Sequence, residues 1–286
     1  NRSQSADEEL LDILQLEKKT AFPLKEEGKS ISLKSESFLE SALQKRKEEN
    51  NKRVLPKNRE RGIDFSSNDY LGFAGSTLIN DSLADYPLHS GSTGSRLLTG
   101  NHAFIEELES RIAQFHKGEA SLIFNSGYLA NIGLLSSIAG KEDCFILDAQ
   151  VHASTWEGMK LSGAKHFVFH HNDLKHCEKQ LIRASRLHKK IFLCVESLYS
   201  MEGDVAPLKK LALLAEKYEV HFIVDEAHAT GVFGDKGEGL VVKEGLESAV
   251  FARIYTFGKA LGTHGASILG SNLLREFLIA FAKSFI

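Results

Sequence analysis

The sequence predicts an α/β protein with a mainly parallel sheet flanked by helices, and two observations support this prediction. From Asp64 onward, short β-branched or aromatic runs alternate with helix-length segments, which is the pattern of βαβ units. The chain has 286 residues, of which 42% are hydrophobic, so it can bury the core that such a fold requires. Ligands of parallel sheets bind beyond the carboxyl ends of the strands, and we therefore expect the functional residues there.

Six short runs predict the strands of this sheet. They lie at residues 121–124, 144–147, 165–169, 191–195, 221–224 and 251–257. The helix-length segments between and after them lie at residues 128–140, 151–163, 173–189, 207–220 and 271–286. Pro207 suits the first turn of the fourth helix. The last segment ends without a Gly, Pro or capping residue, so we expect the chain to be part of a longer protein.

The N-terminal part of the chain has a different composition. Residues 1–60 are rich in charge, and the run LQKRKEENNKRVLPKNRERG predicts an exposed helix followed by a linker. Residues 61–286 are expected to form the folded domain. The sequence therefore predicts a charged helical arm and linker that precede one large α/β domain.

The composition argues against several classes of protein. A formal net charge of -3 lacks the basic excess of a dedicated nucleic-acid binder. The cysteines, Cys144, Cys177 and Cys194, are too widely spaced for a disulfide framework or a C-x-x-C metal site, so we expect a reducing compartment and no metal. No run of about 18 apolar residues occurs, and the chain starts with a polar stretch. We therefore expect a cytoplasmic protein that neither binds nucleic acid nor enters a membrane.

Polar and small residues follow several of the predicted strands. The motif NSGYLAN places Gly127 and Tyr128 where a helix begins, and backbone N–H groups there suit a phosphate, although such a motif is often only a turn and helix cap. His152 opens the next predicted helix, where it would either face solvent or stack on a flat aromatic ligand. The segment ESLYSMEGDVAPL carries Glu196 and Ser200, which are either turn residues or ligand contacts.

The stretch Asp225-Glu226-Ala227-His228 follows another strand and has two interpretations. In nucleic-acid motors, D-E-A-H holds Mg²⁺ beside a nucleotide, which also requires a P-loop. Two Gly-Lys pairs of this chain are followed by Glu142 and Ala260 and lack the required Gly spacing, and Gly28-Lys29-Ser30 has Pro23 in place of the first Gly, so this interpretation fails. The alternative is a carboxylate that faces a pyridine nitrogen and keeps it protonated, with His228 near the same ring.

Lys259 lies after the sixth strand in the motif TFGKALGTHGA. Its neighbours are small or apolar, and such surroundings lower the pKa of an amine and make it a Schiff-base nucleophile. The glycines at 258, 262 and 265 are expected to let a phosphate approach closely, with Thr256 supplying a hydroxyl group. A lysine, a carboxylate and a phosphate seat together point to a pyridoxal-phosphate site.

With these motifs, the chain resembles the α-oxoamine synthases, which are pyridoxal-phosphate enzymes. The resemblance runs in register from about Phe38 to Ile286 through FSSNDYLGF, GSTGSRLLTGNH, NSGYLAN, HAS, ESLYSMEGDVAPL, VDEAHATGVFG and TFGKALGTHGA. It implies the large domain of the aspartate-aminotransferase-like fold, fold type I, with the small C-terminal domain of the family missing from this chain. It also implies a homodimer whose active site lies between the subunits.

The resemblance implies a role for each matching residue. Lys259 matches the lysine that binds the cofactor covalently, Asp225 the partner of the pyridine nitrogen, and His152 the residue stacked on the ring and near the substrate. His228 and Ser200 match contacts of the phenolic oxygen; Thr256 and the backbone of Gly127 and Tyr128 match phosphate contacts; Asn68 and Arg53 match substrate-binding residues. Catalysis is expected from Lys259, His152, Asp225 and His228.

The resemblance also implies a reaction. The motifs GSTGSRLLTGN and ESLYSMEGD are most similar to the branch that condenses L-alanine with a pimeloyl thioester, on coenzyme A or an acyl carrier protein, with loss of CO₂, in biotin biosynthesis. Other branches use serine, as in serine palmitoyltransferase, or glycine, as in 2-amino-3-ketobutyrate CoA ligase and 5-aminolevulinate synthase. A catalytically silent scaffold subunit of the same fold is a further alternative, although such a subunit is expected to lack Lys259.

Overall fold

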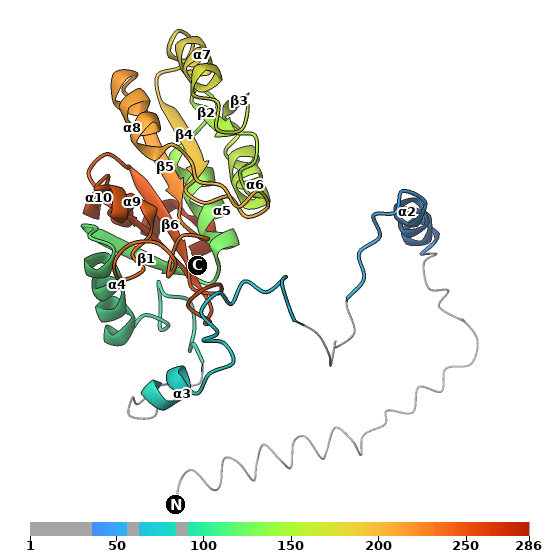
Figure 1. Ribbon diagram of the computed structural model, residues 1–286, viewed down its shortest axis with the longest axis vertical. Helices are drawn as coiled ribbons and strands as arrows, with labels where there is room; N and C mark the ends of the chain where they lie inside the picture. Colours follow the sequence, from blue (N-terminus) through green and yellow to red (C-terminus); the bar gives the residue numbers. More distant parts are fainter. Residues whose placement is uncertain (1–35, 56–62, 84–90, 286) are drawn as a thin grey trace, which may run out of the picture. The chain divides into compact units, whose positions relative to one another are not determined.

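The computed structural model of the protein describes residues 36–55, 63–83 and 91–285 (Figure 1). Its contacts divide the chain into two units with the boundary between Ile63 and Asp64, and each is described by itself. In the first unit, α2 (Ser37–Glu48) has no buried residue, as expected for the predicted exposed helix, because lysine, arginine and glutamate dominate its sequence. The predictions for residues 1–35 and for most of the linker lie outside the described residues.

The second unit contains a seven-stranded sheet in the order β1-β7-β6-β5-β4-β2-β3. The strands are β1 (Ala120–Phe124), β2 (Cys144–Asp148), β3 (Lys165–Phe169), β4 (Ile191–Glu196), β5 (His221–Asp225), β6 (Ala252–Thr256) and β7 (Ala266–Gly270). All six predicted strands are present. The seventh, β7, was not predicted; it lies between β1 and β6 and runs antiparallel to both, so the sheet is mixed but mainly parallel.

Helices cover both faces of this sheet. They are α4 (Ala103–Phe115), α5 (Gly127–Ile138), α6 (Ala153–Ser162), α7 (Leu174–Ser185), α8 (Leu208–Lys217), α9 (Leu240–Glu244) and α10 (Asn272–Phe281), with α3 (Leu78–Leu83) before the sheet and a 3₁₀ turn at Lys283–Phe285. Figure 1 shows α5 beside α6, and α7 beside α8. No helix among the described residues has the length and apolar character needed to cross a bilayer.

Alternate residues of the central strands point into two separate hydrophobic cores. On β4, Phe192 and Cys194 join α5, α6 and α10 in the first core, whereas Leu193 and Val195 join α7, α8 and α9 in the second. Strands that are buried on both faces read as continuous apolar runs, which is why these strands could be recognised in the sequence.

The strand register brings the carboxyl ends of the parallel strands to one edge of the sheet. Glu196 at the end of β4 is paired with Asp225 at the end of β5, and Asp225 is in turn paired with Ile254 of β6, two residues before Thr256. Residues that are far apart in the sequence therefore meet at this edge.

Candidate active site

Asp225 ends β5, is only 7% exposed and is held by two donors. The amide Nδ2 of Asn131, on α5, donates to its Oδ2 at 2.9 Å, and the backbone N–H of Ala227 donates to its Oδ1 at 2.9 Å. Both carboxylate oxygens are thus fixed in direction at the strand end. Asn131 was not assigned a role from the sequence, although it lies in the quoted NSGYLAN motif.

Lys259 and His228 are in direct contact. The Nζ of Lys259 lies 2.5 Å from the Nε2 of His228, and the Nδ1 of His228 lies 2.7 Å from the hydroxyl of Tyr70. The Tyr70 hydroxyl also donates to the Oδ1 of Asn68 at 3.1 Å. The structure therefore joins three predicted site residues through one that was not predicted, Tyr70, which lies two residues after Asn68 in the SSNDYLG motif.

Burial determines the protonation of Lys259 and His228. It lowers the pKa of Lys259, and the charges of Asp225 and Glu196 offset only part of the effect. Burial, followed by the charge of Lys259, also lowers the pKa of His228 to about 4. The imidazole of His228 is therefore neutral at physiological pH, and Lys259 loses its proton more readily than an exposed lysine.

Glu196 is a further buried acid at this edge. It ends β4 with 4% of its surface exposed, and burial, together with the charge of Asp225, raises its pKa to about 8. A backbone hydrogen bond from His152 acts in the opposite direction. Glu196 is thus mainly protonated at neutral pH, and it can hold a proton beside Asp225.

The N-terminus of α5 lies against the end of β6. A Cβ atom at Gly127 would stand 3.5 Å from the Cβ and Oγ1 of Thr256. The side chain of Ser126 caps the helix by accepting from the N–H of Leu129 at 3.2 Å. Tyr128, in the first turn, is 45% exposed. A helix N-terminus beside a threonine hydroxyl suits a phosphate group, and the phosphate contacts of these residues stay a prediction.

The other predicted site residues have fewer contacts. His152 is the exposed N-cap of α6, and its Nδ1 accepts from the N–H of Ser154 at 3.2 Å. Ser200 is exposed in the segment that joins β4 to α8. Arg53 is exposed and belongs to the first unit, so its contact with a substrate stays a prediction.

Two glycines of the TFGKALGTHGA motif also serve chain packing, while their expected contact with a phosphate stays a prediction. At Gly262, φ is 62° and a Cβ atom would lie 2.4 Å from the backbone N of Ala74. At Gly265, φ is 99° and a Cβ atom would lie 3.2 Å from the carbonyl oxygen of Phe124. Both positions need glycine for the backbone conformation as well as for space.

Glu226 follows Asp225 but has a different function. Its side chain is fully buried and accepts from the N–H groups of Leu240 at 2.8 Å and Val241 at 2.7 Å, at the start of α9. Glu226 therefore stabilises a helix N-terminus instead of taking part in the site.

A comparison with known families follows from this geometry. The family model described as aminotransferase class I and II matches residues 60–286. The chain belongs to the aminotransferase class I and II family. This membership confirms the predicted fold class and the predicted resemblance to pyridoxal-phosphate enzymes.

Several proteins related to this aminotransferase-family chain carry names from the α-oxoamine synthases. The chain is 42% identical to an 8-amino-7-oxononanoate synthase of Emericella nidulans over 266 residues, which are 87% of this chain and 65% of the relative. The chain thus spans less than two thirds of that relative's length.

Solved structures show the same relationship. A serine palmitoyltransferase of S. paucimobilis with a bound PLP–myriocin aldimine has a TM-score of 0.74 at 28% identity, and the match covers 87% of this chain and 66% of that one. An 8-amino-7-oxononanoate synthase from Francisella tularensis has a TM-score of 0.66 at 28% identity, with 80% and 64% covered.

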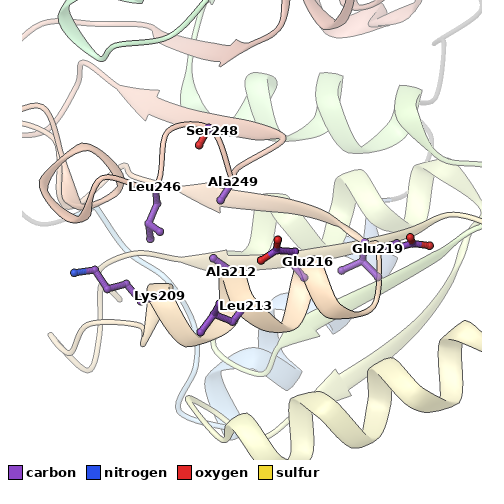
Figure 2. Close-up of a pocket in the computed structure, with 10 residues that line it drawn as sticks. Lys209, Ala212, Leu213, Glu216, Glu219, Leu246, Ser248 and Ala249 are labelled. Carbon is purple, nitrogen blue, oxygen red and sulfur yellow. The ribbon is translucent and has the colours of Figure 1, made fainter.

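A large surface groove lies away from the carboxyl ends of the parallel strands. It has a volume of about 700 Å³ and runs between α8 and the segment that joins α9 to β6, lined by residues such as Leu213, Glu216 and Leu246 (Figure 2). None of the predicted site residues lines it. The convergence of ionisable groups, and not the volume of a hollow, therefore marks the candidate site of this aminotransferase-family chain.

Proposed function

We propose that the chain carries the pyridoxal-phosphate site of an α-oxoamine synthase that condenses L-alanine with a pimeloyl thioester. The observation that carries the proposal is the contact between Lys259 and His228 at the same sheet edge as the fixed carboxylate of Asp225. A nucleophilic amine and a buried carboxylate at the ends of neighbouring parallel strands are what a pyridoxal-phosphate site requires.

The residues present fit the cofactor. The N-terminus of α5 at Gly127 and the hydroxyl of Thr256 would hold its phosphate, because backbone N–H groups and a hydroxyl are suitable donors to an anion. Asp225 would face the pyridine nitrogen and Lys259 would bind the aldehyde. His152, at the start of α6, would lie on the ring, and Ser200 would contact its phenolic oxygen.

Pyridoxal phosphate, when bound, withdraws electrons from the Cα atom of an attached amino acid. Asp225 would keep the pyridine nitrogen protonated through its opposite charge. Lys259, with its lowered pKa, would remove the Cα proton as a general base and later return it. His228 would orient the Lys259 amine, and Glu196 would hold a proton within the same buried group.

The choice of substrates rests on similarity to named relatives. The 42% identity to an 8-amino-7-oxononanoate synthase supports L-alanine and a pimeloyl thioester of coenzyme A or an acyl carrier protein. A homodimer in the cytoplasm stays part of the proposal, on the family resemblance of the sequence. The similarity to serine palmitoyltransferase supports serine as the second candidate. Arg53 and Asn68 are the proposed substrate-binding residues on this chain.

Borohydride reduction tests the proposed site. The protein incubated with pyridoxal phosphate and then reduced should carry a pyridoxyl group on Lys259, detected by peptide mass spectrometry. The Lys259→Ala variant should carry none there, whereas Lys210→Ala, which removes an exposed lysine of α8, should behave like the unchanged protein. An unlabelled Lys259 in the unchanged protein would contradict the proposal.

A second measurement decides between the amino acids. The visible spectrum of the cofactor-loaded protein should change at lower concentrations of L-alanine than of glycine or L-serine. A response to L-serine at the lowest concentration would favour the serine branch instead, and the site itself would stand.

A further inference from the structure

His171 lies between two aspartates. Its Nδ1 is 2.9 Å from the Oδ1 of Asp148, and its Nε2 is 3.0 Å from the Oδ2 of Asp204. A carboxylate can only accept a hydrogen bond, so both ring nitrogens must donate. The Nδ2 of Asn172 also lies 3.3 Å from this Nε2, but it donates to the Oδ2 of Asp204 at the shorter distance of 2.8 Å. The geometry therefore favours the doubly protonated, positively charged form of His171.

One of these aspartates is fixed to the sheet. Asp148 ends β2 and its side chain is fully buried. It also accepts from the backbone N–H groups of Gln150 and Asn172, each at 2.9 Å. Asp148 thus provides a rigid anchor, and the charge of His171 compensates the buried carboxylate.

The other aspartate belongs to a loop that follows β4. An isolated bridge between Leu198 and Val205 closes this loop, and the N–H of Tyr199 donates to the carbonyl oxygen of Asp204 at 3.0 Å. The buried ring of Tyr199 packs edge-on against His171, with 4.4 Å between ring centroids. Ser200 lies at the exposed part of the same loop.

A second donor strengthens the connection to the loop. The Nδ2 of Asn172 donates to the Oδ2 of Asp204 at 2.8 Å, beside the bond from His171. The loop also begins directly after the site, because the N–H of Ser197 donates to the carbonyl oxygen of Asp225 at 2.9 Å. Asp204 is therefore part of a segment that starts beside Asp225 and carries Ser200.

We propose that His171 is a positioning residue: as an imidazolium ion it fastens the loop 198–205 to β2 and so holds Ser200 where it contacts the cofactor. The function of Ser200 in this statement rests on the proposed function, whereas the attachment of the loop by His171 does not.

The proposal implies a dependence on pH with a definite sign. Burial lowers the pKa of His171, but the hydrogen bonds and charges of Asp148 and Asp204 outweigh it, so the net pKa is raised. A group whose pKa is raised on folding contributes its stabilisation at low pH and loses it as the pH rises through the folded pKa. The loop should therefore be fastened at acidic and neutral pH and be released at higher pH.

The other ionisable groups near His171 do not reverse this sign. Tyr199 faces the ring, and burial raises its pKa well above its usual range, so it stays neutral. Two further groups interact electrostatically with Asp148: Glu196 on β4 and Cys177 on α7. Burial raises the pKa of both, so neither replaces His171 as the positive partner of Asp148.

Cleavage by a glutamate-specific protease after Glu202, an exposed residue of the loop, tests the proposal without cofactor. Rates are measured between about pH 5 and pH 9, where an imidazole titrates, and are divided by the rate for the same protein after denaturation. In the unchanged protein the normalised rate should rise with pH. In His171→Gln the normalised rate at low pH should be about tenfold higher than in the unchanged protein, because the hydrogen bonds between the imidazolium ion and the two aspartates are lost. The normalised rate of this variant should not depend on pH.

Matched variants complete the experiment. His170→Gln changes the neighbouring exposed imidazole, which packs on His176, and should retain the pH profile of the unchanged protein. If His171→Gln does not fold, Asp204→Asn replaces it, because this variant leaves the buried pair of Asp148 and His171 intact. Asp204→Asn should weaken the protection of the loop against cleavage. A pH-independent rate in the unchanged protein, or the same profile in Asp204→Asn, would overturn the proposal.

Cofactor binding separates the two proposals. The dissociation constant of pyridoxal phosphate should rise in His171→Gln, whereas the pyridoxyl label should still form on Lys259. A protein that shows the pH-dependent protection but never forms the label would support the attachment by His171 and overturn the proposed function.

Discussion

Two buried groups of charges in the sheet domain contrast with each other. At β1 and α4, the carboxylate of Glu109 accepts from Arg96, from Arg275 at 2.8 Å and from the backbone N–H of Ile123 at 2.9 Å, so the buried carboxylate is fully bonded. At the site, Lys259 contacts a neutral imidazole, and no carboxylate pairs with it among the described residues. The first arrangement stabilises the fold, whereas the second leaves a buried amine free for chemistry.

Removing the carboxylate that Arg96 and Arg275 share should have the largest effect on stability. Glu109→Gln leaves Arg96 and Arg275 without their common carboxylate, and we expect a loss of about 3–5 kcal/mol in the free energy of unfolding. Urea denaturation followed by circular dichroism measures it. Glu107→Gln, which changes an exposed residue of the same helix, should alter the stability by less than about 0.5 kcal/mol. Equal effects of the two variants would show that the Glu109 group is not structural.

Removing the charge of Asp225 should reduce the reaction and leave the fold intact. Asp225→Asn keeps the size of the side chain, and we expect kcat to fall about 100- to 1000-fold, because the charge that the site directs at the cofactor is lost. The rate of CO₂ release from amino acid and thioester measures it, with unfolding as the control. Unchanged kcat would remove Asp225 from the proposed mechanism.

A change at Glu226, the next residue, should lower the stability of the fold and leave the cofactor site intact. Glu226→Gln loses one of the two acceptors at the start of α9, and we expect a loss of about 1–3 kcal/mol in the free energy of unfolding. The pyridoxyl label on Lys259 should form as in the unchanged protein. A variant of full stability that no longer forms the label would mean that Glu226 belongs to the site.

Removing the Tyr70 hydroxyl should have the smallest effect. Tyr70→Phe leaves the Nδ1 of His228 without its 2.7 Å partner, and we expect kcat to fall about five- to tenfold, equivalent to about 1 kcal/mol. The pH at which an amine reagent modifies Lys259 in the cofactor-free protein should also shift. If neither quantity changes, the Tyr70 contact does not influence Lys259.

The sequence predicted what depends on local pattern. Each of the six short β-branched or aromatic runs forms a strand, and residues that follow them closely, among them Asp225 and Lys259, lie at the expected edge. The contacts of Asp225 and His228 could not be predicted in this way. Asn131 is separated from Asp225 by 94 residues and Tyr70 from His228 by 158, and only the tertiary structure brings them together.

The missed elements have physical reasons as well. The strand β7 follows the glycine-rich motif around Lys259, and its short ASILG sequence was not distinguishable from a loop. The positive φ at Gly262 and Gly265 was also not predicted, because a left-handed backbone conformation cannot be recognised from sequence alone.

The position of β7 also determines the order in which the domain can be completed. Among the described residues, the edge strand β1 pairs only with β7, with Ala120 opposite Gly270, so most of the domain must be synthesised before β1 finds this neighbour. At the usual speed of translation this takes on the order of 10 s. During that time the unpaired edge of β1 is open to pairing with other chains, until β7 covers it.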